Sequence, residues 1–244
     1  MISQMKLIFT LLVFIFTIIN AEEIPTNYNK YKDIVYKEIS ITIPNLYVPP
    51  IIPSLIEHET CITLTHSKCW NPKAELRTPR ELGVGLGQMT KAYRKDGTLR
   101  FDTLTEMVKR YPKELKGLDW KTVYTRPDLQ VRSVLLLYRD NFKRFNIPNI
   151  DYFDRLAFTD AAYNGGYSGV LKDIQLCKMK KNCNHLVWFD NVEKTSSKGN
   201  TVLYGKRTAT DINRHHVRDV LINNLPKYTT IWEKDKYDIL YPIP

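Results

Sequence analysis

In this 244-residue chain, the type and position of Glu59 make it a candidate for acid–base chemistry. It lies on an apolar stripe with helical spacing that runs from Ile52 to Ile62. A carboxyl group on such a stripe is partly removed from water, which favours the protonated form that a general acid needs. Glu57 lies roughly 200° around the same helix, so we expect it to face solvent. If the stripe ends earlier, Glu59 is instead an ordinary surface acid.

A glycine-rich motif further along the chain could shape a binding cleft. Residues 83–88 read GVGLGQ, and the glycines permit positive φ angles and close approach of the backbone to a ligand. Gln88 offers donors and an acceptor suited to an acetamido or hydroxyl group of a sugar. The motif lacks the strand–turn–helix setting of a dinucleotide site. A tight structural turn is the alternative interpretation.

A second motif, AAYNGG at residues 161–166, has the composition of a helix end. Its glycines terminate a helix, so Tyr163 and Asn164 would be presented at that end. The alternative is that Tyr163 packs in the core and Asn164 only caps the helix.

The order of Glu59-Thr60, Gly85–Gln88 and Ala162–Gly166 resembles the soluble lytic transglycosylases and goose-type lysozymes. That family has the patterns Glu-Ser, Gly-Leu-Met-Gln and Ala-Tyr-Asn-Ala-Gly. The resemblance covers roughly residues 50–175 and is strongest to the transglycosylase-like endolysins of bacteriophages. Those proteins share the run Glu-x-Glu-Ser/Thr-Cys, here at 57–61, and the run Cys-Trp-Asn-Pro, here at 69–72.

The resemblance implies cleavage of the β-1,4 bond between N-acetylmuramic acid and N-acetylglucosamine, without a cofactor or metal. Glu59 would protonate the leaving oxygen and then accept the proton of the muramic 6-hydroxyl. The product would carry a 1,6-anhydro end, and one carboxylate suffices for this reaction, whereas most glycosidases use two. The substrate-binding residues implied are Thr60, Gly85, Gln88, Tyr163 and Asn164.

The chain also departs from the family patterns. Thr60 stands in place of the usual serine and keeps the hydroxyl group. Gly87 stands in place of methionine, which removes a side-chain contact at the turn. The gap from Glu59 to Gly85 is longer than usual in the family.

A muramidase that hydrolyses the same bond is the alternative activity, and it would more often need a second carboxylate to position water. The candidates are Glu81 and Asp160. Glu81 could instead close a capping box with Thr78 at the start of a helix. Asp160 could instead pair with one of the many Arg or Lys side chains. A non-cutting wall-binding module and a chitinase are further alternatives.

Other conspicuous residues receive structural interpretations. Adjacent histidines on a helix face different directions, so His215 and His216 are expected to make surface or interhelical contacts and not to bind metal. Trp70 is the tryptophan most expected in the cleft, although core packing is the default for this residue type.

The fold predicted is mainly α, an α+β lysozyme-like domain with a cleft and a small irregular or β region near 63–90. Helical patterns recur at about 103–111, 128–145, 151–164, 168–180 and 211–224. Their expected N-caps are Asp128, Asp151 and Ser168. The catalytic domain would span 48–244. An extended arm at 22–47, with a short strand at 39–43, would precede it.

Composition and the N-terminus suggest export. Residues 1–21 read as a signal peptide, because Lys6 precedes a short apolar run. We therefore expect a periplasmic or extracellular protein that acts on the cell wall.

An even number of cysteines suggests the local disulfides Cys61–Cys69 and Cys177–Cys183. The net charge of +10 favours anionic wall or membrane surfaces, and no nucleic-acid motif is present. We expect a monomer whose partner is peptidoglycan.

Overall fold

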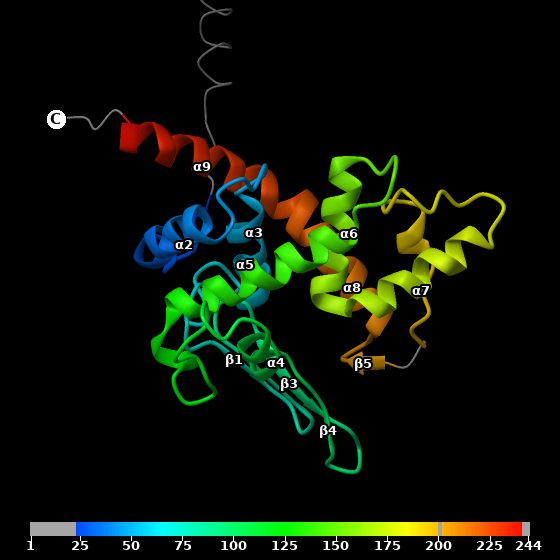
Figure 1. Cartoon of the computed structure of the whole chain (residues 1–244), viewed down its shortest axis with the longest axis horizontal. Coiled ribbons are helices and arrows are strands. Elements are labelled where there is room, and N and C mark those ends of the chain that lie inside the picture. The colour runs from blue at the N-terminus through cyan, green and yellow to red at the C-terminus, as the bar shows by residue number, and fades with distance from the viewer. Residues whose placement is uncertain (1–22, 200–201, 241–244) are drawn as a thin grey trace, which may run out of the picture.

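The computed structural model describes residues 23–199 and 202–240, so the expected signal peptide at 1–21 lies outside the described residues. The predicted fold class is confirmed: helices dominate, and there is one small four-stranded antiparallel sheet. Figure 1 shows the sheet projecting from the helical part, below helix α5. In residues 23–199 and 202–240, no helix is both long and apolar enough to span a bilayer.

Helix α5 (Pro127–Arg144) is the centre of the packing. Half of its 18 residues are buried, among them Val131, Val134 and Leu135. Helix α6 (Tyr152–Gly165) packs on one side of it and α2 (Tyr28–Thr42) on another. Helix α3 (Ile51–Thr60) lies beside α2 and against the C-terminal helices. The elements that carry the three motifs therefore share one core.

The expectation of an extended arm at 22–47, with a strand at 39–43, is wrong. Residues 28–42 form α2, because Tyr28, Val35 and Ile39 repeat at helical spacing and are buried. Arg132 of α5 donates to both carboxylate oxygens of Glu38 at 2.8 Å, which fixes α2 to the core. The folded unit thus begins well before residue 48.

The sheet is a meander of β1 (Glu75–Arg77), β2 (Glu81–Val84), β3 (Met89–Tyr93) and β4 (Leu99–Asp102). It extends past the region near 63–90 in which a β element was predicted. Thr78 does not cap a helix with Glu81: its hydroxyl accepts from the Glu81 N–H at 3.0 Å in the turn between β1 and β2. The capping-box interpretation is therefore wrong.

Three of the remaining helices follow the predicted ranges closely, whereas α9 (Leu225–Leu240) was not predicted. The three are α4 (Thr103–Arg110), α7 (Tyr167–Lys178) and α8 (Ala209–Arg218), which continues through the π-helical turn η3 (Asp219–Asn224) into α9. Short elements are the 3₁₀ turns η1 (Val123–Thr125) and η2 (Val192–Lys194) and the pair β5 (Val202–Tyr204) and β6 (Arg207–Thr208).

Of the three expected N-caps, only Asp151 is confirmed. Its carboxylate accepts from the Phe153 N–H at 2.8 Å. Arg126 precedes α5 in place of Asp128, because Pro127 occupies the first helical position. Gly166, and not Ser168, precedes α7.

Both predicted disulfides, Cys61–Cys69 and Cys177–Cys183, are present. The first ties the end of α3 to the loop before Trp70. Trp70 itself is fully buried, and its indole N–H donates to the Tyr228 hydroxyl at 3.1 Å. The expectation that Trp70 lines the cleft is therefore wrong, and core packing is its role.

Candidate active site

A groove of about 1000 Å³ runs between the sheet, the C-terminal ends of α3 and α6 and the segment before α8. It brings together residues that lie more than 100 positions apart. Its lining includes these predicted residues: Glu59, Thr60, Glu81, Gln88, Tyr163 and Asn164. Gly85 and Asp160 do not line it. The three motifs thus meet at one groove, although two of the nominated residues lie behind its wall.

Glu59 lies in the last turn of α3, and its side chain is 14% exposed. The apolar stripe before it is buried, but α3 ends at Thr60 and Ile62 is exposed, so the stripe does not extend to Ile62. Glu59 Oε1 lies 2.9 Å from Nε2 of His216. Its carboxylate is therefore held at the groove wall by a residue of α8.

His216 lies between two carboxylates. Its Nδ1 is 2.8 Å from Oδ2 of Asp160, which is fully buried on α6. Burial alone would lower the pKa of His216, but Asp160 and Glu59 raise it to about 10. The imidazole is therefore a cation at neutral pH, and both of its N–H groups donate. Asp160 compensates the charge of the imidazolium.

These contacts give the two carboxylate oxygens of Glu59 different roles. Because His216 donates to Oε1, that oxygen acts as an acceptor whether or not Glu59 is protonated. Oε2 makes no hydrogen bond within the described residues, and Glu59 lines the groove. Oε2 is therefore the oxygen of Glu59 that is available to a ligand.

Tyr163 joins the helix end to the glycine-rich turn. Its hydroxyl donates to the Gly87 carbonyl at 2.6 Å, and its ring stacks with the ring of His216 at 6.3 Å. Burial and the nearby charge of Glu59 raise the pKa of Tyr163 well above its usual value. The hydroxyl therefore stays neutral. Asn164 is exposed at the groove, and its Oδ1 accepts from Asn213 Nδ2 at 3.1 Å.

The glycine-rich turn is held by its own side chains. Gly85 has φ of 77°, and a Cβ atom there would lie 2.5 Å from the side chain of Gln130. Gln130 accepts from the Leu86 N–H at 2.8 Å. Gln88 Nε2 donates to the Gly85 carbonyl at 2.9 Å, while its Oε1 is buried without a partner. The Gln88 amide therefore serves the turn: its donors bond the turn, and its acceptor oxygen is covered.

Gly87 explains the departure from the methionine of the family pattern. A Cβ atom at Gly87 would lie 2.1 Å from Cγ2 of Val134 and 2.7 Å from the hydroxyl of Tyr163. The turn packs directly on α5, and there is no room for a side chain. Close approach of backbone to helix replaces the side-chain contact.

Thr60 and Glu57 have structural roles. The Thr60 hydroxyl donates to the Ile56 carbonyl at 2.7 Å and accepts from the Trp70 N–H at 2.9 Å, so it holds the disulfide loop. Glu57 is buried, not solvent-facing as expected. Lys227 and Tyr228 donate to its carboxylate at 2.6 to 2.7 Å. The packing of α9 on α3 covers the face on which Glu57 lies.

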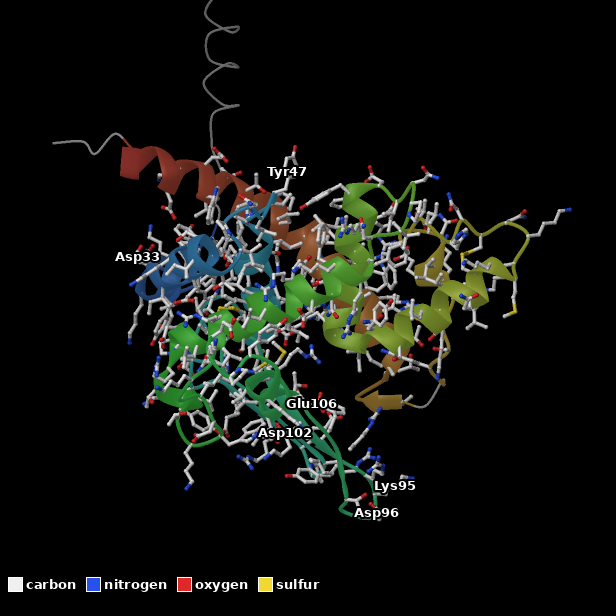
Figure 2. All side chains as sticks on the ribbon, in the orientation of Figure 1. Asp33, Tyr47, Lys95, Asp96, Asp102 and Glu106 are labelled. Atoms are coloured by element: carbon white, nitrogen blue, oxygen red, sulfur yellow. A yellow bond between two sulfur atoms is a disulfide. The ribbon has the colours of Figure 1, made fainter. Side chains whose placement is uncertain are left out.

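Asp160 is not placed to position water, because it is fully buried and bonded to His216; the expected Arg or Lys partner is also wrong. Glu81 does line the groove. So does Glu106, an exposed carboxylate of α4 that sequence reasoning missed; Figure 2 shows it on the helix beside the sheet. Glu75 lines the groove as well, so three carboxylates besides Glu59 lie along it.

His216 is the other functional residue that sequence reasoning missed. The histidines do face different directions: His215 is 46% exposed at the side chain, and His216 is buried. The available signal was spacing, since Asn213, His216 and Val217 form the buried face of α8. No cluster of three or more His, Cys, Asp or Glu side chains in the described ranges is arranged to hold a metal ion.

A scan of the sequence against protein-family models finds no match, and a search of curated proteins finds no significant similarity.

Proposed function

We propose that the protein is a peptidoglycan lytic transglycosylase in which Glu59 is the catalytic acid and base. One observation carries the proposal: the Glu59 carboxylate, anchored through Oε1 by His216, presents Oε2 to a groove that Gln88 and Tyr163 also line. The groove volume, about 1000 Å³, is at the upper end of ordinary ligand pockets and suits several sugar rings.

The geometry supports both proton transfers by one residue. Oε2 of neutral Glu59 protonates the glycosidic oxygen, and the bond from that oxygen to the anomeric carbon breaks. The Glu59 carboxylate then takes the proton of the muramic 6-hydroxyl, whose oxygen bonds to the anomeric carbon. No water is consumed, and Glu59 ends protonated. The imidazolium of His216 stabilises the carboxylate formed between the two steps.

A muramidase is the second candidate, because Glu81 and Glu106 also line the groove. In that reaction one of them would orient a water molecule as the nucleophile, and Glu59 would remain the acid. The products differ: hydrolysis gives a reducing muramic end, whereas transglycosylation gives an anhydro end.

Glu59→Gln tests the role of Glu59. This variant keeps the shape of the side chain and an acceptor for His216, but the amide that replaces Oε2 cannot transfer a proton to the glycosidic oxygen or take one up. We expect loss of glycan release from purified peptidoglycan with unchanged pull-down by insoluble wall. Unchanged release would refute the proposal. A wild-type protein that binds wall but releases nothing would instead favour a binding module, and preferential cleavage of chitin would favour a chitinase.

A further inference from the structure

Lys198 is a half-buried lysine that lines the groove, and among the described residues no carboxylate lies within salt-bridge distance of its Nζ. Its Nζ makes no hydrogen bond or salt bridge within the part of the chain that the structure describes. Burial is the main cause that lowers the pKa of Lys198; the charges of Arg214 and Arg100 act in the same direction, and the more distant carboxylate of Asp173 opposes them only in part. An ammonium group that is partly removed from water without a partner costs free energy of folding.

Other partly buried lysines of this protein have carboxylate partners. Nζ of Lys32 lies 2.8 Å from Asp235, Nζ of Lys91 lies 3.3 Å from Asp102, and Nζ of Lys227 lies 2.6 Å from Glu57. Lys198 differs from them in facing the groove. A ligand in the groove could therefore supply the carboxylate that the protein does not.

The ammonium group lies at the end of α6, beside Gly165 and Asn213. A Cβ atom built at Gly165 would lie 2.5 Å from Nζ of Lys198 and 2.8 Å from Nδ2 of Asn213. Asn213 is about one turn before His216 on α8, which corresponds to ~5 Å along the helix. Lys198 and Glu59 line the same groove, and Lys198 reaches it beside Gly165, two residues after Tyr163. The lack of a side chain at Gly165 leaves room for the ammonium group.

The backbone before Lys198 is firmly anchored. The Ser197 N–H donates to the buried carboxylate of Asp173 at 2.6 Å, and Arg214 donates to the same carboxylate at 2.9 Å. The Lys198 N–H donates to the Ser196 hydroxyl at 3.1 Å. Arg100, from β4, also lines the groove. This side of the groove therefore carries positive charge on a supported loop.

We propose that Lys198 binds a carboxylate on the 3-O-substituent of the muramic acid residue, and so selects muramyl glycans over neutral ones. The inference rests on the proposed function. The carboxylate has two sources: the free lactyl group of glycan without peptides, or the peptide stem where one is attached. Both place a negative charge beside a sugar ring, and chitin oligosaccharides have neither.

The test measures binding, so that it does not depend on cleavage. Lys198→Met and Lys198→Gln are made in the full chain carrying Glu59→Gln, with Lys95→Met as the matched control. Figure 2 shows Lys95 beside Asp96 at the far tip of the β3–β4 hairpin, where it is exposed, and it does not line the groove. Calorimetry uses three soluble oligosaccharides: peptide-bearing muramyl glycan, the same glycan stripped of peptides, and chitotetraose.

Loss of a charged hydrogen bond should raise Kd for muramyl glycan about 10- to 100-fold in both Lys198 variants. Kd for chitotetraose and for the control should stay within about twofold. A loss confined to one muramyl ligand identifies the stem or the lactyl group as the source. Equal weakening for muramyl glycan and chitotetraose, or no weakening, would overturn the inference while the proposed function stands. No binding of any glycan by the Glu59→Gln protein would refute both.

Discussion

The buried His216 cation should make the protein lose stability as pH rises from neutral to alkaline. His216 is charged in the folded protein, with a pKa of about 10, because Asp160 and Glu59 offset the effect of burial. In the unfolded chain its pKa is 6.5. A raised folded-state pKa gives a stabilisation that is fully present below pH 6.5 and is lost as pH rises toward 10.

The size of the effect follows from these two values. A change of one in pKa corresponds to about 1.4 kcal/mol, so the site contributes on the order of 5 kcal/mol to the free energy of unfolding below pH 6.5. Between pH 7 and pH 9 the loss should be about 2 to 3 kcal/mol. The window avoids most other titrations, since the shifted tyrosines described have pKa values raised above 10.

The assay is denaturant unfolding at pH 7, 8 and 9, followed by tryptophan fluorescence. Disulfide exchange should not interfere, because all four cysteines are paired. The double variant His216→Gln/Asp160→Asn removes the imidazole and the fully buried carboxylate together, so that Asp160 is not left as a buried charge without its partner. Its loss of stability between pH 7 and pH 9 should be smaller than that of the wild type by about 2 to 3 kcal/mol. His215→Gln, at the exposed neighbouring position, should behave as the wild type does.

Parallel slopes for the wild type and the double variant would refute the reasoning. If the double variant does not fold, NMR of the wild-type histidine rings gives the same test. The His216 ring should remain an imidazolium at pH 8, and a neutral ring at that pH would refute a cation held between two carboxylates.

The other predictions concern the elements that hold the groove. Glu57→Gln should lower the free energy of unfolding by about 2 to 3 kcal/mol, because Lys227 loses its charged partner. Its kcat should be unchanged, because Glu57 does not line the groove. A loss of activity at normal stability would mean that Glu57, and not Glu59, is the catalytic glutamate. Gly87→Ala should cost about 1 to 3 kcal/mol in urea unfolding and lower kcat as well, because its Cβ meets Val134 and Tyr163; wild-type stability would show that the turn does not pack on α5 as described.

Local patterns predicted much of the fold. Apolar spacing located α3, α5, α6 and α7 within a few residues, and the even cysteine count and local spacing suggested both disulfides. The arm at 22–47 was mistaken because lysine and asparagine dilute the apolar face of α2. That face becomes visible only once α5 is known to cover it.

The sequence predicted several residues that line the groove, but it did not predict the residues behind them that hold them in place. Glu59, Gln88 and Tyr163 lie in motifs whose composition is unusual, so they could be selected from the sequence. His216 could not, because its role depends on α8 packing against α6 and α3 at a separation of 157 residues from Glu59. Glu57 was assigned to solvent for the same reason: the helix that buries it, α9, lies 170 residues away.

Mass spectrometry of the fragments that the protein releases from purified peptidoglycan tests the central claim most directly. We predict muropeptides that are lighter by one water than hydrolysed ones and carry 1,6-anhydro muramic ends, with none released by Glu59→Gln. Fragments with ordinary reducing ends would contradict transglycosylation and turn attention to Glu81 and Glu106 as water-positioning groups. Fragments of either kind released at the wild-type rate by Glu59→Gln would contradict the assignment of Glu59 itself.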